Sequence, residues 1–348
     1  MSKARLALFL AVMVAAGARA DHESADTILQ QFKRISERGG YVLQPAKSVR
    51  ALAPSADKAA VERVAADAQA FLRGALSVVI VQNGELLFEG YANGATAESP
   101  LNSYSMTKSL TALAVGEALC AGKLKSLEDK ASAYVPALEG TAYGAASLRN
   151  LLRFTSGAQD PGGDGYGGVH SPEDFRAMIF HKIAISDLLK KYGQPGRYGP
   201  GEKFVYNGLD SQSLGLVVRA ATGAPLQKWF EETVWQKAGA EHRAGWWPDR
   251  EGNGVAEVAS YVTTRDFARI GLYVLERLTG KAGEPCMVEF MRDAAKPHVQ
   301  KGYWSSAPGF GLGLHFGADG NTWIFGHGGQ RVGVNPKSGR VFATNEAV

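Results

Sequence analysis

The sequence predicts an α+β protein in which strands from both chain ends form one antiparallel sheet, flanked by helices, with a mostly helical insertion in the middle. The first observation is Asn83-Gly84, which lies between two apolar, strand-like runs. Asn-Gly favours a type I′ hairpin turn, because that turn needs positive φ at both central residues. The second observation is a series of short strand-like runs near the C-terminus, whereas the middle of the chain has apolar residues at helical spacing. The hairpin strands are expected at residues 76–81 and 86–91, the late strands at 309–316, 322–326, 331–334 and 340–344, and helical segments at 148–152 and 212–221.

Further local predictions follow from caps and apolar spacing. Ser55 is expected to cap a helix that continues to about residue 72, and Ser105 opens an apolar helix that ends near Ala121. Residues 258–278 have the pattern of a helix pair. Residues 21–50 show no strong period and are expected to wrap the surface.

The first twenty residues have the features of a secretory signal peptide. Lys3 and Arg5 precede an apolar run at residues 6–17, and the A-R-A sequence at 18–20 is a cleavage site before Asp21. The apolar run is too short to span a bilayer. We therefore expect an exported protein, either periplasmic or secreted, with no membrane span in its mature form.

Composition indicates a soluble globular chain. Of its 348 residues, 45% are hydrophobic and 21% are charged. We expect a single domain in which residues 21–120 and 251–348 form the sheet region and residues 121–250 form the helical region. Removal of the basic leader leaves the mature chain nearly neutral and without a run of Lys or Arg, so we expect no nucleic-acid partner and no anionic membrane surface.

The sequence predicts neither a metal site nor a cofactor. Its seven histidines form no H-E-x-x-H motif, and none lies near a cysteine at ligand spacing. A G-x-G-x-x-G match at residues 163–168 follows no strand and opens no helix, which argues against a nucleotide site. Cys120 and Cys286 could pair in an oxidising compartment, but the apolar helix pattern favours Cys120 as a small core residue.

Two S-x-x-K patterns are candidates for nucleophilic chemistry. Ser55 and Lys58 begin the surface-like helix, where a cap and a solvated charge explain them. Ser105 and Lys108 instead begin the strongly apolar helix, where spacing i, i+3 brings both side chains to one face. A buried lysine is disfavoured in its charged form and can accept a proton from a serine. The alternative is that Ser105 only caps the helix and that Lys108 extends its ammonium to solvent.

Several ordered motifs resemble the serine β-lactamase and penicillin-binding-protein superfamily, in particular its class C-like branch. After S-M-T-K come L-E-D-K-A-S-A-Y-V-P-A-L, S-L-R-N-L-L-R-F-T-S-G, P-G-E-K-F-V-Y-N-G-L-D-S-Q-S-L-G and W-I-F-G-H-G-G-Q. The resemblance covers about residues 70–345 and implies a β-lactamase/transpeptidase-like fold. The stretches F-x-Y-N-x-L-D-S-Q-x-L-G and T-T-R-D-F-A-R-I-G are most similar to the 6-aminohexanoate-dimer hydrolases and the esterases of this superfamily.

The resemblance implies a role for each matching residue. Ser105 would attack the acyl carbon, and Lys108 and Tyr206 would share the acid and base duties, with the first base left open between them. The backbone N–H groups of Ser105 and Gln330 would form the oxyanion hole. Without the resemblance, the favoured interpretation of Tyr206 is a core tyrosine with a satisfied hydroxyl. Further substrate-binding residues are expected at His327, Gly328, Gly329, Gly208 and Tyr166.

Two departures from the family pattern bear on the substrate. Gly208 stands where β-lactamases of this branch have an Asn that holds the substrate's side chain, and His327 stands where they have a Lys that holds its carboxylate. We therefore expect a hydrolase that acts on an amide or ester of a small-molecule or peptide-like acyl substrate. The oligomeric state does not follow from the sequence.

Two alternatives remain for the function. One is a D-alanyl-D-alanine peptidase or weak β-lactamase, because the motifs are shared with those enzymes. The other is a catalytically idle ligand-binding homologue. The family usually has a helix after its last strand, and the sequence reaches Val348 before one, which favours the idle homologue. Intact Ser105, Lys108 and Tyr206 favour an enzyme.

Overall fold

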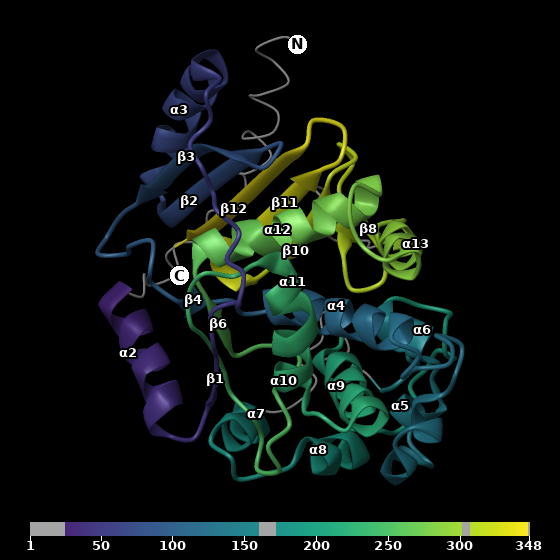
Figure 1. Ribbon diagram of the computed structural model, residues 1–348. Helices are drawn as coiled ribbons and strands as arrows, with labels where there is room; N and C mark the ends of the chain where they lie inside the picture. The colour runs from purple at the N-terminus through teal and green to yellow at the C-terminus, as the bar shows by residue number, and fades with distance from the viewer. Residues whose placement is uncertain (1–24, 160–171, 301–306, 347–348) are drawn as a thin grey trace.

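The computed structural model describes residues 25–159, 172–300 and 307–346 (Figure 1). Its largest element is an eight-stranded antiparallel sheet in the order β3-β2-β12-β11-β10-β9-β8-β7. The early strand β2 pairs with the late strand β12, so segments from the first and last parts of the chain share this sheet, as predicted. The strands are β2 (Ala75–Gln82), β3 (Glu85–Tyr91), β7 (Val299–Gln300), β8 (Gly309–Phe310), β9 (His315–Phe316), β10 (Thr322–Phe325), β11 (Arg331–Asn335) and β12 (Arg340–Glu346).

The predicted hairpin between β2 and β3 is confirmed. Asn83 has a φ of 53° and Gly84 a φ of 88°, which are the two positive values that a type I′ turn requires. The N–H of Asn83 also donates to the carbonyl of Gly339, at 2.8 Å, which ties this turn to the one between β11 and β12.

Strand β2 is apolar on both faces because a helix covers each face of the sheet. Ile80 packs in a cluster with α3 (Lys58–Leu72), whereas its neighbour Val81 belongs to the large core that includes α12 (Thr264–Thr279). Successive strand side chains point to opposite faces, so a strand between two helix layers loses the usual polar alternation. Figure 1 shows α3 beside β2 and β3 and α12 running across the sheet.

Helices α9 (Gly208–Thr222), α10 (Leu226–Phe230) and α13 (Pro285–Ala294) pack against α4 (Met106–Cys120), which follows Ser105 as predicted. Nearly every α4 residue is buried, as expected for a helix that is apolar on all sides. No helix within the three described ranges is long and apolar enough to cross a membrane. The helices are α5 (Ala142–Ala145), α6 (Leu148–Leu152), α7 (Pro172–Ile179), α8 (Ile185–Lys191), α9 (Gly208–Thr222), α10 (Leu226–Phe230), η3 (Glu231–Trp235), α11 (Gln236–Ala238) and α13 (Pro285–Ala294), with short 3₁₀ turns η1 (Ala131–Ala133), η2 (Pro136–Leu138) and η4 (His327–Gly329).

A second, four-stranded sheet was not predicted. Its order is β1-β5-β6-β4, with β1 (Tyr41–Leu43), β5 (Ala244–Trp246), β6 (Ser260–Val262) and β4 (Leu101–Asn102). The prediction of a helix pair at 258–278 was therefore wrong in its first part, which is β6. The expectation of a wrapping segment at 21–50 missed α2 (Ala25–Glu37) and β1. Strands of two or three residues are too short to show a period of two.

The predicted cap of α3 was also wrong. Asp57, not Ser55, accepts the N–H of Ala60, at 2.9 Å, and α3 begins at Lys58. Ser55 instead donates its hydroxyl to Glu85, at 2.7 Å, and accepts the N–H of Asp57, at 3.2 Å. Both residue types are good caps, so the sequence alone did not choose between them.

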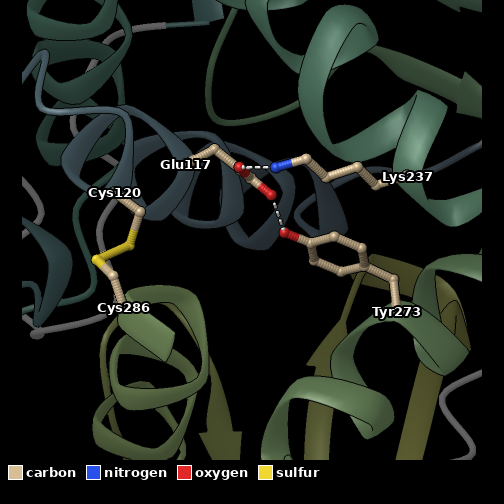
Figure 2. The surroundings of a disulfide bond; sticks show 5 residues. All are labelled: Glu117, Cys120, Lys237, Tyr273 and Cys286. Atoms are coloured by element: carbon tan, nitrogen blue, oxygen red, sulfur yellow. Dashed lines mark hydrogen bonds and ion pairs between the residues drawn. A yellow bond between two sulfur atoms is a disulfide. The ribbon is translucent and has the colours of Figure 1, made fainter. Parts of the chain in front are cut away.

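Cys120 and Cys286 form a disulfide, which corrects the prediction that Cys120 is an ordinary core residue (Figure 2). The bond joins the last residue of α4 to the start of α13, and the two Cα atoms are 5.6 Å apart. Gly116 permits this approach, because a Cβ there would lie 2.5 Å from a ring carbon of Phe290. The covalent link therefore fixes α13 against the C-terminal end of the helix that begins after Ser105.

Candidate active site

Ser105 lies at the junction of β4 and α4, in a turn whose conformation is stabilised by hydrogen bonds from neighbouring side chains. Tyr104 adopts a φ of 44°, which is rare for a residue with a bulky side chain. Its N–H donates to the Asn102 side chain at 3.0 Å, and its carbonyl accepts the Thr107 hydroxyl at 2.8 Å. Ser105 makes no side-chain capping hydrogen bond, so its hydroxyl is available for another role at the positive end of the helix.

Lys108 points back from the first turn of α4 towards that hydroxyl. Its Nζ lies 3.1 Å from Ser105 Oγ and 2.9 Å from the backbone carbonyl of Glu257. The Lys108 side chain is 6% exposed, so it does not extend to solvent. These contacts exclude the alternative in which Ser105 caps the helix and Lys108 is a surface charge.

Tyr206 completes the predicted group from a different part of the chain. It lies in the loop that leads into α9, and Lys108 Nζ is 5.1 Å from the centre of its ring. The ring packs edge-on against Phe154 at 5.1 Å between centroids. Phe154 in turn stacks on Phe310 and meets Phe204, so an aromatic cluster supports Tyr206. The structure thus brings together the three residues predicted to be catalytic.

Glu257 is a residue of this site that sequence reasoning missed. Its side chain is 8% exposed, and Oε2 lies 3.9 Å from Lys108 Nζ. The signal was available: Glu257 is the single charged residue in the otherwise apolar run 255–259. A lone carboxylate in such a run predicts a buried charge that needs a partner.

Gly208 lies directly against Glu257. A Cβ at Gly208 would be 1.6 Å from Glu257 Oε2, so no side chain fits at this position while the carboxylate is there. The neighbouring Asn207 caps α9 by accepting the N–H of Leu209, at 2.9 Å, and donates to the Tyr143 hydroxyl at 3.2 Å. Gly208 is therefore a packing requirement of the site as well as a departure from the family pattern.

The third predicted motif lies beside the turn that precedes α4. A Cβ at Gly326 would be only 2.6 Å from the Ser103 carbonyl, so the backbones of β10 and the turn before α4 are in close contact. The His327 ring meets the Tyr104 ring at 5.7 Å between centroids. Gly328 and Gly329 have φ values of 72° and 94°, which explains the two glycines.

The structure places Gln330 just after this turn, where its side chain is buried and its carbonyl accepts the Gly326 N–H at 2.7 Å. The pairing of its own N–H with that of Ser105 in an oxyanion hole stays a prediction. Tyr166 lies outside the described residues.

An ion pair supports the glycine turn from behind. Arg331 donates from Nε to the Gly329 carbonyl at 3.0 Å and from a terminal nitrogen to Glu346 at 2.5 Å. Burial raises the pKa of Glu346, and the nearby Arg331 charge opposes that shift. A Cβ at Gly329 would be 2.2 Å from the Glu346 carboxylate, so this pair also requires glycine there.

The other S-x-x-K pair has a structural role. Ser55 bonds to Glu85 and to the backbone of Asp57, and Lys58 is exposed at the start of α3. Within the described ranges, no group of three or more His, Cys, Asp or Glu is arranged to hold a metal ion.

Comparison with known proteins establishes the family. A family model described as Beta-lactamase matches residues 62–345. The chain belongs to the Beta-lactamase family. It is 29% identical over 175 residues to a beta-lactamase of Pseudomonas fluorescens, a match that covers 48% of this chain and only 44% of that relative. The resemblance stated from the sequence is thereby confirmed.

Solved structures of this family share the fold. A provisionally assigned 6-aminohexanoate-dimer hydrolase from Bacillus anthracis superposes with a TM-score of 0.69 at 20% identity, covering 92% of this chain and 88% of its own. A D-stereospecific amidohydrolase from Streptomyces sp. superposes with a TM-score of 0.60 at 18% identity. The match covers 84% of this chain and 94% of the amidohydrolase chain. At these identities the likeness establishes the β-lactamase/transpeptidase-like fold, as predicted, and does not identify a substrate.

Proposed function

We propose that the protein is a serine hydrolase that cleaves an amide or ester through an acyl-enzyme on Ser105. The observation that carries the proposal is the 3.1 Å contact between Lys108 Nζ and Ser105 Oγ, made by a buried lysine. A serine hydroxyl is a weak nucleophile until a neighbouring group takes its proton. Lys108 and Tyr206 are the two groups that supply this activation here.

The reaction follows from these positions. Ser105 Oγ bonds to the acyl carbon as its proton passes to the Lys108–Tyr206 pair, and the carbonyl oxygen becomes an oxyanion. Donors at the start of α4 and after the 327–329 turn would stabilise that charge. The bond to the leaving amine or alcohol breaks as the leaving group regains the proton. Water then attacks the acyl-enzyme and releases the acid.

The substrate we favour is a linear amide or ester. Gly208 offers no side-chain amide, and the carboxylate of Glu257 occupies the adjacent space. His327 lies against Tyr104 and replaces the lysine that would hold a β-lactam carboxylate. Two contacts used in β-lactam binding are therefore replaced.

Ser105→Ala tests the assignment, and Ser55→Ala is its matched control. We expect Ser105→Ala to lower hydrolysis of a p-nitrophenyl ester by at least about 10³-fold and to abolish labelling by a fluorophosphonate probe. Ser55→Ala should leave both unchanged, because Ser55 lies in the surface S-x-x-K pair. Wild-type rates in Ser105→Ala would refute the proposal, and an unlabelled wild type would favour the idle homologue.

We also propose that the protein is exported, periplasmic or secreted. The basic start, apolar run and A-R-A site of residues 1–20 support this. The disulfide between Cys120 and Cys286 supports it independently, since such bonds persist in oxidising compartments. The mass of the exported protein should correspond to a chain that begins at Asp21, and retention of residues 1–20 would contradict the proposal.

A further inference from the structure

Glu257 is a charged group beside the Ser105–Lys108 pair, and the mechanism above gives it no role. Two positions on one helix, α9, hold its carboxylate in place. Gln212 on α9 donates from Nε2 to Glu257 Oε1 at 3.2 Å, and the Gln212 carbonyl oxygen accepts the Ala256 N–H at 2.9 Å. Gly208, on the first turn of the same helix, leaves the space that Oε2 fills. The position of the carboxylate is thus fixed on both sides.

Lys108 receives two different interactions from this one residue. The backbone carbonyl of Glu257 accepts a hydrogen bond from Nζ at 2.9 Å, and the carboxylate Oε2 lies 3.9 Å from the same atom. Both side chains are more than 90% buried. An isolated buried charge of either sign is strongly unfavourable, whereas a close pair in low dielectric stabilises both charged forms.

Other ionisable groups at the site do not supply this charge. Burial raises the pKa of Asp210 well above its usual range, which favours the neutral form of that carboxyl. Burial raises the pKa of Tyr143, which therefore stays protonated. Tyr206 faces Lys108 through its ring. Among these neighbours of Lys108 and Glu257, Glu257 is the group that supplies a formal negative charge to Lys108.

We propose that Glu257 is a positioning residue that keeps Lys108 as an ammonium directed at Ser105 Oγ. The inference rests on the proposed function and deepens it. An ammonium is a donor without an acceptor site, so Lys108 holds the hydroxyl and stabilises negative charge on it. On this proposal Tyr206, rather than Lys108, takes the serine proton.

Glu257→Gln is the direct test, because it keeps the shape of the side chain and removes its charge. The variant loses the negative charge that lies about 4 Å from Lys108 Nζ, and with it the electrostatic stabilisation of the ammonium. We expect the basic limb of the kcat/KM–pH profile for ester hydrolysis to move to lower pH by about 1–3 units. A purely structural role would lower activity without moving this limb. Glu37→Gln, which neutralises an exposed carboxylate on α2, is the matched control and should overlay the wild type.

Gly208→Ala tests the role of the Glu257 carboxylate in a second way, by displacing it from its position. Its new Cβ would collide with Oε2 and move the charge away from Lys108, so the basic limb should again shift to lower pH. The double variant Gly208→Ala/Glu257→Gln should show no further shift, because both changes remove one interaction. If Glu257→Gln does not fold, the Gly208→Ala profile decides the question.

The outcomes separate the two proposals. If the wild type is labelled by the fluorophosphonate and the basic limb is unchanged in Glu257→Gln and in Gly208→Ala, the role of Glu257 is refuted and the Ser105 mechanism stands. A wild type that neither labels nor hydrolyses overturns the proposed function itself, and the inference with it.

Discussion

Asp210 lies in the first turn of α9 and is fully buried. Burial raises the pKa of its carboxyl well above the usual range, and hydrogen bonding with Ser156 opposes this only in part. The folded protein therefore binds a proton that the unfolded chain releases near pH 4. The stability that the protonated Asp210 carboxyl contributes is fully present below that pH. It is lost as the pH rises through the pKa of Asp210 in the folded protein.

Asp210→Asn should remove this pH dependence. The amide has the same shape and does not ionise, so the variant should be more stable than the wild type at neutral and higher pH. Urea unfolding between pH 4 and pH 9 measures the difference, with Asp187→Asn, at an exposed aspartate on α8, as the control. Equal slopes of unfolding free energy against pH in the wild type and Asp210→Asn would contradict a raised pKa of Asp210 in the folded protein.

At the scale of elements, the approach of α12 to the sheet depends on Gly271. A Cβ there would lie 2.4 Å from a methyl carbon of Val341 on β12 and 3.0 Å from one of Val332 on β11. Neither valine is the end of a flexible side chain, so a larger residue forces helix and sheet apart. Gly271 therefore sets the distance between these two layers.

Gly271→Ala should lower the free energy of unfolding by about 1–3 kcal/mol through overpacking. Val341→Ala removes the closest methyl group, and as a single change it should lower stability because it leaves a cavity. Combined with Gly271→Ala, it should partly restore the stability that Gly271→Ala loses. Thermal or urea unfolding of the wild type, the two single variants and the double variant gives the four free energies of a double-mutant cycle. Strictly additive losses would show that the two positions do not compete for the same space.

At the scale of the whole molecule, the Cys120–Cys286 bond closes a loop across 166 residues. It joins α4 to α13 beside a polar group inside the core (Figure 2). There, Glu117 accepts from Lys237 and from the Tyr273 hydroxyl, each at 2.5 Å. The C-terminal end of α4 is thus fixed covalently and by charge, while Ser105 lies at the other end.

The double variant Cys120→Ala/Cys286→Ala should have a free energy of unfolding about 3–5 kcal/mol lower than the wild type, because a long loop regains conformational freedom in the unfolded chain. Dithiothreitol should lower the melting temperature of the wild type and leave that of the double variant unchanged. Cys286 is exposed, so the reductant can reach the bond. Identical melting of the oxidised and reduced wild type would show that the bond contributes little.

Local chemistry explains which parts of the fold were predictable. The β2–β3 turn is specified by Asn83 and Gly84 themselves, and the apolar run after Ser105 is long enough to identify α4. The two-residue strand β4 and the three-residue strands β1, β5 and β6 carry no comparable pattern. Their pairing is decided by partners distant in the sequence.

The sequence by itself determined the α+β class, the hairpin, the helix that follows Ser105 and the family motifs that contain Ser105, Lys108 and Tyr206, because each depends on residues close together in the chain. Only the tertiary structure decided that Cys120 pairs with Cys286 and that Glu257 lies against Gly208 and Lys108. Those contacts join positions about 50 to 170 residues apart. These long-range contacts depend on how whole helices pack, and no local periodicity or turn sequence predicts that packing.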